Sequence, residues 1–177
     1  MTNQKTLAEL SEAVTQFFPK IQLQIIIDAC FDHENDEWQV NQQYYRDLLQ
    51  GFAEIFQKMP KTYETNPEQF DENGNEILEE DASSGGNAIA YLHYFVGGCD
   101  WWITEKDMEE EQLQAFGVVK LGNNRPEFGY INLVELSNSV IKHSSGMPLS
   151  VELDFHWQPK RLKDIPELAS LFPNVHQ

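Results

Sequence analysis

Apolar residues recur every three or four positions through the first sixty residues, which is the spacing of amphipathic helices. Thr6 can cap the first helix, and Glu9, three positions later, can complete a capping box. Pro19 separates the first helix from the second, and Pro60 ends the third. The apolar positions are Leu7, Leu10, Val14, Phe17 and Phe18 in the first helix, Ile21, Ile25, Ile26 and Ala29 in the second, and Tyr44, Leu48, Phe52, Ile55 and Phe56 in the third.

After Gly86 the pattern changes to short aromatic and aliphatic runs between turn residues, which is typical of β-strands. We expect strands at 88–96, 101–104, 113–120, 128–133 and 150–157. A helix is expected over 133–141, and a short amphipathic helix over 162–172 around Pro166. Consecutive strands that follow helices predict an α+β fold, in which N-terminal helices pack on a mainly antiparallel sheet of about five strands, with a short C-terminal helix.

The segment between these two parts has few apolar residues. Asn73-Gly74-Asn75 and Ser83-Ser84-Gly85-Gly86 supply turn chemistry, so we expect a long surface loop. The sequence therefore predicts a helical segment at 1–58, an acidic loop at 59–87 and an antiparallel-sheet domain at 88–177. A chain of 177 residues fits one domain with a helical extension.

Charge narrows the class of partner. The chain has 29 acidic and 12 basic residues, for a net charge of -17. Residues 61–120 hold fourteen of the acidic residues against three basic ones, and no basic residue lies between Glu64 and Asp81. A field of this sign and size repels DNA and anionic membranes and attracts basic protein surfaces. We expect a basic host protein or nucleoprotein complex as partner, and no direct binding of nucleic acid or membrane.

The sequence also indicates a compartment. Apolar runs such as 25–27 are far shorter than the ~20 residues of a membrane-spanning helix, and the N-terminus does not resemble a signal peptide. Cys30 and Cys99 stand far apart and outside any paired motif, so we expect two buried thiols in a reducing compartment. These features predict a soluble protein in the cytoplasm of a bacterial host.

An ordered series of short motifs in the second part of the chain resembles a known family. Trp101-Trp102-Ile103-Thr104-Glu105 is followed by Phe116-Gly117-Val118 and Pro126-Glu127-Phe128-Gly129-Tyr130. The series ends with Glu152-Leu153-Asp154 and Pro159-Lys160-Arg161-Leu162. From about residue 59 to 165 the chain resembles the family catalogued as domain of unknown function 2958, and residues 1–58 look additional to it. The resemblance implies a setting on plasmids, phages and integrative elements, and it implies no particular chemistry.

The sequence offers two candidate metal sites. Cys30, His33, His93 and Cys99 could supply four zinc ligands, but structural zinc sites usually have two closely spaced pairs and here only the first two residues are close. Asp71, Asn73 and Asn75 imitate the start of a calcium-binding loop. Glu76 replaces the required glycine, and Ala82 replaces the final glutamate, which excludes an EF-hand. We expect no metal and no cofactor.

Enzyme motifs are also missing from the sequence. We find no glycine-rich phosphate loop, no Gly-x-Ser-x-Gly and no His-Glu-x-x-His. An alternative is a small hydrolase or nucleotide-processing enzyme that uses Glu105, Asp107 and Glu127 as acid and base. Carboxylates at strand ends are more often solvated charges, so we expect no catalytic residues. His93 and His156 are interpreted as ordinary sheet residues.

Four aromatic residues, Trp101, Trp102, Phe116 and Trp157, raise the question of a platform that stacks nucleic-acid bases. Such platforms lie beside basic grooves that follow the phosphates. The basic cluster Lys160-Arg161-x-Lys163 is too small for this, so these aromatic residues are interpreted as core.

The acidic runs are then the strongest functional candidate. Carboxylates on a protein surface can imitate the spacing of DNA phosphates and occupy a groove lined by Lys and Arg. The sequence predicts an acidic phage- or plasmid-type inhibitor of a host defence system, anti-CRISPR or anti-restriction, which occupies a basic, nucleic-acid-binding protein surface. An immunity protein against a basic nuclease toxin is a further alternative. The expected partner-binding residues are Asp71, Glu72, Glu76, Glu79, Glu80, Asp81, Asp107, Glu109, Glu110 and Glu111.

Overall fold

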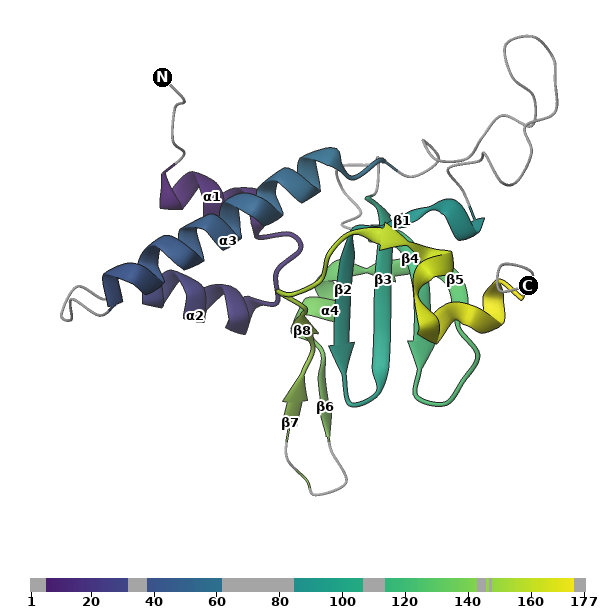
Figure 1. Ribbon diagram of the computed structural model, residues 1–177. Coiled ribbons are helices and arrows are strands. Elements are labelled where there is room, and N and C mark those ends of the chain that lie inside the picture. The colour runs from purple at the N-terminus through teal and green to yellow at the C-terminus, as the bar shows by residue number, and fades with distance from the viewer. Residues whose placement is uncertain are drawn as a thin grey trace, which may run out of the picture.

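The computed structural model describes residues 6–31, 38–61, 85–106, 114–142, 146 and 148–173. It has the predicted α+β architecture, with three N-terminal helices beside an antiparallel sheet (Figure 1). The helices are α1 (Leu7–Val14), α2 (Lys20–Phe31) and α3 (Trp38–Lys58). Within the described ranges, none of the helices is long and apolar enough to cross a membrane.

The predicted start of the first helix is confirmed. The Thr6 side-chain oxygen accepts the backbone N–H of Glu9 at 3.2 Å, and the Glu9 carboxylate accepts the backbone N–H of Thr6 at 2.7 Å. This reciprocal capping box satisfies two backbone donors that the first turn leaves without partners.

Five antiparallel strands form the main sheet, in the order β5-β4-β3-β2-β8. Gly97 and Gly98 both have positive φ, at 52° and 82°, and they join β2 to β3 as a two-residue turn. Such turns need left-handed conformations that glycine adopts freely, and they fix the register of the strands on each side. The strands are β2 (Leu92–Val96), β3 (Cys99–Lys106), β4 (Gln114–Leu121), β5 (Glu127–Asn132) and β8 (Glu152–Leu153).

Smaller elements complete the fold. Two short antiparallel pairs, β1 with β9 and β6 with β7, stand outside the main sheet. The bounds are η1 (Gly85–Asn87), β1 (Ile89–Ala90), α4 (Leu133–Asn138), β6 (Val140–Lys142), β7 (Pro148–Ser150), β9 (Lys160–Arg161), η2 (Leu162–Asp164) and η3 (Pro166–Leu171), where η marks a 3-10 helix.

Three predicted elements are shorter than expected. The strand predicted at 150–157 is reduced to β8, because the Asp154 side chain accepts the His156 backbone N–H and turns the chain. The helix predicted at 133–141 ends at Asn138, where Ser139 takes an extended conformation that leads into β6. The C-terminal helix is divided into η2 and η3 at Pro166, which has no backbone N–H to continue a helix.

The sheet separates two apolar cores. The helices cover one face, where Leu92, Tyr94 and Ile103 pack against Phe18 and Phe52. The C-terminal segment crosses the opposite face, as the yellow ribbon in Figure 1 shows. There the buried residues are Ala88, Ala90, Trp102, Val118, Leu162, Ile165 and Leu168.

Polar contacts bind the helices to the sheet. The buried Tyr94 hydroxyl donates to the backbone carbonyl of Phe17, and burial raises the pKa of this phenol. The Gln22 side chain donates to the backbone carbonyl of Leu153 at 3.3 Å and accepts the backbone N–H of the same residue at 2.7 Å. The Lys106 ammonium donates to the carbonyl of Phe56. The helices therefore form one folded body with the sheet.

Some apolar residues predicted to face this core point outward. Ile21, Ile25 and Tyr44 are more than half exposed, at 60%, 58% and 51%. The packing of α2 on α3 buries Leu23, Ile26 and Cys30 of α2 and Leu49 of α3, and of these only Ile26 belongs to the predicted apolar positions.

A fragment of residues 59–177 is expected to be poorly soluble. Without the helices, the apolar face that includes Leu92, Tyr94 and Ile103 would be exposed to water, and large exposed apolar patches cause aggregation. Soluble yield and size-exclusion chromatography of this fragment, compared with the whole chain, check the expectation. A stable, monomeric fragment would show that the sheet folds independently of the helices.

Candidate functional site

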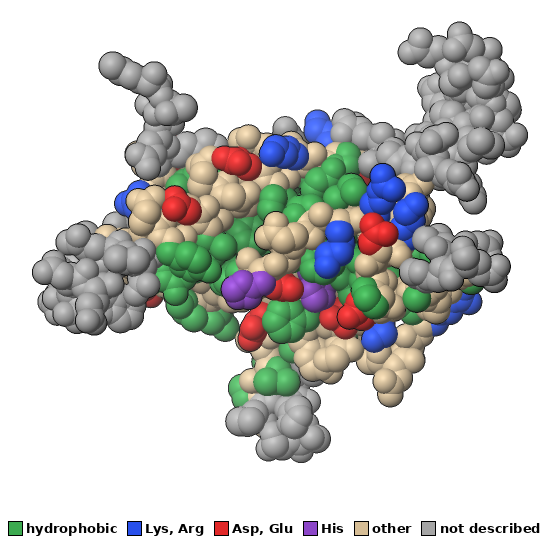
Figure 2. Space-filling model, viewed as in Figure 1, with side chains coloured by type: hydrophobic (Ala, Val, Ile, Leu, Met, Phe, Trp, Pro, Cys, Tyr) green, Lys and Arg blue, Asp and Glu red, His purple; other side chains and the backbone are tan. Residues whose placement is uncertain are grey.

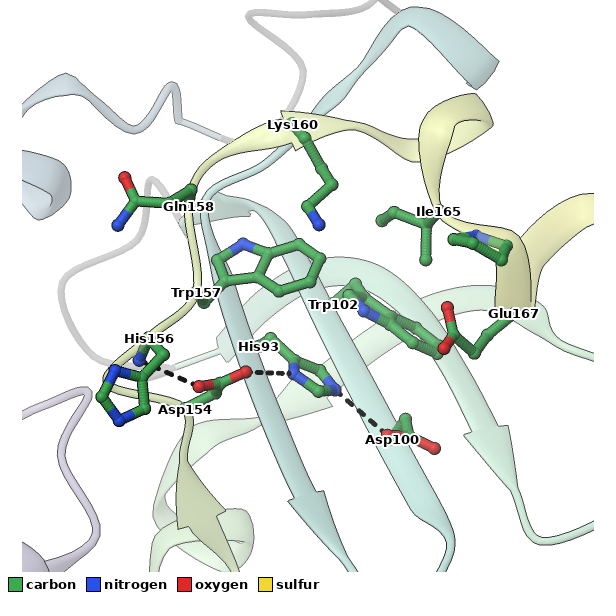
Figure 3. Close-up of a pocket in the computed structure, with 11 residues that line it drawn as sticks. His93, Asp100, Trp102, Asp154, His156, Trp157, Gln158, Lys160, Ile165 and Glu167 are labelled. Carbon is green, nitrogen blue, oxygen red and sulfur yellow. Dashed lines mark hydrogen bonds and ion pairs between the residues drawn. The ribbon is translucent and has the colours of Figure 1, made fainter.

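A pocket of ≈ 380 Å³ opens on the face of the sheet that the C-terminal segment covers. Its volume lies within the range of small-molecule sites. Figure 3 shows His93 between the carboxylates of Asp154 and Asp100, with the rings of Trp102 and Trp157 next to it. The lining residues are His93, Asp100, Trp102, Asp154, His156, Trp157, Gln158, Lys160, Ile165, Pro166 and Glu167.

Strand register places the first three of these residues. His93 on β2 lies opposite Trp102 on β3, and Asp100 lies two residues from Trp102 on the same strand. Because side chains alternate between the faces of a sheet, these three share one face. Asp154 follows β8, and its backbone N–H donates to the carbonyl of His93 at 2.9 Å, which brings the Asp154 carboxylate beside the imidazole.

Both ring nitrogens of His93 contact carboxylates. Nδ1 lies 3.2 Å from Oδ2 of Asp154, and Nε2 lies 3.0 Å from Oδ1 of Asp100 (Figure 3). A neutral imidazole has one N–H, so both contacts are hydrogen bonds from the ring only when it carries two protons. The other Asp154 oxygen accepts the backbone N–H of His156 at 2.9 Å. This arrangement fixes the histidine and leaves neither ring nitrogen to face a ligand.

Aromatic rings surround the same histidine. The His93 ring stacks on Trp102 at a centroid distance of 5.3 Å and an interplanar angle of 9°, and it lies 5.0 Å from the ring of Trp157. The Trp157 indole N–H donates to the carbonyl of Ala90 at 2.9 Å, which fixes this second ring. The Lys160 ammonium lies 4.3 Å from the centroid of Trp157, within the range of a cation–π interaction.

Trp102 is only 1% exposed, and its Nε1 is a buried donor without a hydrogen-bond partner among the described residues. A buried indole N–H normally finds an acceptor, because an unsatisfied buried donor is costly. An unsatisfied buried donor therefore belongs to a side chain of the pocket wall.

The pocket has an excess of negative charge. Asp100, Asp154 and Glu167 carry three carboxylates, against the cations of Lys160 and, when protonated, His93. One negative charge remains uncompensated when His93 is protonated and His156, which also lines the pocket, is neutral. The face seen in Figure 2 accordingly shows histidine, acidic and hydrophobic side chains side by side near its centre. In the described parts of the chain, no group of three or more His, Cys, Asp or Glu residues is arranged to hold a metal ion.

The structure separates the zinc ligands weighed from the sequence. Cys30 and Cys99 pack in the core between helices and sheet, while His93 lies on the opposite face, and His33 lies outside the described residues. Burial raises the pKa of the Cys30 thiol, more than the nearby Arg46 lowers it, and this favours the uncharged thiol.

The carboxylates of the enzyme alternative are not brought together as a pair. Glu105 is buried and lies opposite Phe116 on β4. Glu127 is exposed on β5 and lies opposite Val119, so β4 and three residues of register separate the two side chains. Asp107 lies outside the described residues.

All ten expected partner-binding residues, which belong to the segments 62–84 and 107–113, also lie outside the described residues. The structure does describe the residues that precede these segments. Lys61 and Lys106 form a parallel β-bridge, and the Lys106 backbone N–H donates to the carbonyl of Pro60 at 2.9 Å. The two acidic segments therefore begin from adjoining backbone positions.

Charge is divided unevenly between the described and undescribed parts. The described residues include thirteen acidic and eleven basic side chains. The segments 32–37, 62–84 and 107–113 contain the other sixteen acidic residues and no basic one. The described body is thus close to charge balance, and most of the net charge belongs to these three segments.

Sequence reasoning missed the pocket. His93 was interpreted as an ordinary sheet residue, and Trp101 and Trp102 were grouped as core. They lie on opposite faces, with Trp101 towards the helices and Trp102 in the pocket. The Gly97-Gly98 turn and strand alternation were a sufficient signal to place His93, Asp100 and Trp102 on one face. No local signal joins Asp154 to them, because a long connection separates β8 from β2.

Comparison with known families gives one match. Residues 64–169 match the family described as "Protein of unknown function (DUF2958)", and this range contains every residue that lines the pocket. No curated protein and no solved structure matches the chain. The match covers more than half of the chain and leaves α1, α2 and α3 outside it. The chain therefore belongs to the DUF2958 family and adds an N-terminal helical segment to it.

Proposed function

We propose that this protein is an acidic binding protein that inhibits a host defence system, anti-CRISPR or anti-restriction, by occupying a basic, nucleic-acid-binding protein surface. It acts in the cytoplasm of a bacterial host and is of phage or plasmid type, the setting that the family resemblance implies. It is a binding protein and not an enzyme.

The observation that carries this proposal is the common origin of two acidic segments. The segments 62–84 and 107–113 hold twelve acidic residues and no basic one, and both begin at the bridge between Lys61 and Lys106. Because the described body is close to charge balance, these acidic residues dominate the field of the protein. Such a field attracts a surface lined by Lys and Arg and speeds its association.

The site geometry supports binding over catalysis. A histidine that acts as a general base needs one ring nitrogen within reach of a substrate proton. In His93 both nitrogens contact carboxylates, of Asp100 and Asp154. Glu105 and Glu127 lie apart in the sheet, so these two carboxylates do not form an acid–base pair with each other. An immunity protein against a basic nuclease toxin would use the same acidic segments, and the identity of the partner distinguishes the two.

Association with the basic partner is expected to slow strongly as salt is added. Exposed charges are screened beyond a Debye length of about 8 Å at physiological ionic strength, and steered association rates exceed unsteered ones by about 10- to 1,000-fold. The measurement is the association rate by stopped flow over a series of salt concentrations, with a partner purified from the host. An association rate that does not change with salt would contradict electrostatic steering.

A further inference from the structure

The pocket between the sheet and the C-terminal segment lies among described residues and is distinct from the acidic segments, which lie outside them. We propose that this pocket binds one lysine or arginine side chain of a protein partner, together with a backbone carbonyl next to it. This inference rests on the proposed function for the nature of the partner, because a basic protein surface supplies such side chains.

Charge favours a cation as the occupant. In the pocket, two of the three carboxylates contact His93, and the third, Glu167, belongs to the first turn of η3 at the rim. Figure 3 shows the Glu167 carboxylate across the pocket from Trp157. One uncompensated negative charge beside two aromatic rings attracts an ammonium or guanidinium group.

The protein's own Lys160 shows that the pocket accepts such a group. Its ammonium lies 4.3 Å from the centroid of Trp157, although the residue is exposed and its long side chain can turn towards solvent. A partner's cation would therefore compete with Lys160 for this ring. An anionic ligand would instead be held by Lys160, so removal of the Lys160 charge has opposite effects on the two kinds of ligand.

Trp102 specifies the second half of the ligand. The Trp102 side chain lines the pocket, and its buried indole N–H has no hydrogen-bond partner among the described residues, so an acceptor that reaches it would satisfy it. A bare cation supplies donors only and would leave this N–H unpaired. A lysine or arginine within a peptide supplies both groups. Its backbone carbonyl can accept from Trp102, and its side-chain cation can pair with the Glu167 carboxylate at the rim.

The test uses three small probes on the whole chain. N-acetyl-lysine N-methylamide carries the cation and the carbonyls, N-acetyl-norleucine N-methylamide has only the carbonyls, and butylammonium has only the cation. The readout is the shift of the indole N–H signals of Trp102 and Trp157 in nuclear magnetic resonance titrations. We expect saturable shifts with the lysine probe, and binding weaker by about fivefold or more for each of the other two, because each loses one interaction.

Two variants make the test specific. Glu167→Gln is expected to lower the affinity for the lysine probe about two- to fivefold, as for the loss of an exposed ion pair. The control is Glu152→Gln, at an exposed acidic position outside the pocket, which should leave the affinity for this probe unchanged. Lys160→Met is expected to raise the affinity for the lysine probe, because the competing ammonium is removed. Equal affinity for the lysine and norleucine probes, or weaker binding by Lys160→Met, overturns the inference.

Failure of this inference and failure of the proposed function are distinguishable, because the probes require no macromolecular partner. If the lysine probe does not bind while association with the partner remains salt-sensitive, only the pocket assignment is wrong. If the probe binds as expected while that association rate is independent of salt, only the electrostatic mechanism is wrong.

Discussion

Replacing Gly117 with alanine is expected to prevent the chain from accumulating as a stable folded protein. A Cβ at this position would lie 2.0 Å from the backbone oxygen of Trp102 and 3.0 Å from Cα of Ile103. These are backbone atoms of β3, and β4 cannot move away from them because β5 is paired on its other edge. Overpacking of this kind costs about 3 kcal/mol or more, a large part of an ordinary domain's stability.

The matched control is Gly129→Ala. Gly129 on β5 is the direct cross-strand neighbour of Gly117, and a Cβ built there meets no atom within 4 Å. We expect the free energy of unfolding of this variant to lie within about 0.5 kcal/mol of the parent value, as is usual for surface substitutions. Urea unfolding and soluble yield measure both variants. Equal stability of the two would show that β3 and β4 are not held as closely as the register implies.

Reversing five charges in the segment 62–84 is expected to abolish binding to the basic partner. The variant replaces Glu72, Glu76, Glu79, Glu80 and Asp81 with lysine, which changes the net charge from -17 to -7. Like charges opposed across an interface cost several kcal/mol, so the affinity should fall by more than about 100-fold. The measurements are the affinity for the purified partner and the plating efficiency of a phage on a host whose defence the protein is proposed to inhibit.

A second variant, with the same net charge but with the substitutions elsewhere, tests whether the position of the charges matters. Glu12, Glu54, Glu127, Glu135 and Glu152 are exposed acidic residues of the described body, and their replacement with lysine gives the same net charge. We expect this control to retain most of the binding. If both variants lose binding equally, net charge alone is responsible and the acidic segments are not the binding surface. If the variant of segment 62–84 still binds normally, the proposed mechanism is wrong.

Local signals predicted the fold well. Thr6 and Glu9 identified the start of the first helix, and Gly97-Gly98 identified the hairpin of β2 and β3, because caps and tight turns depend on a few neighbouring residues. The faces of helices were predicted less well. Ile25 has the right spacing for the core and yet is exposed, because tertiary packing chooses which side of an apolar helix is covered.

The pocket required information that a single sequence does not display. His93 and Asp100 are close in sequence, but the second carboxylate on His93 comes from Asp154, sixty-one residues away. That contact depends on where β8 joins the sheet and on the turn that the Asp154 side chain makes with His156. Charge, in contrast, could be counted along the sequence, and the count already placed much of the acid in residues 61–120. The structure adds that the residues it describes are close to charge balance.

The sorting of tryptophans between the two faces of the sheet makes the protein suitable for optical measurement. The chain has four tryptophans, and of these Trp102 and Trp157 line the pocket while Trp101 faces the helices. Phenylalanine at Trp38 and Trp101 would leave indole emission from the pocket pair alone. His93 stacks on Trp102 in the same pocket, so a ligand bound there would change the surroundings of these rings. Occupancy of the pocket could then be followed in an unlabelled protein, at concentrations far below those of a titration by magnetic resonance.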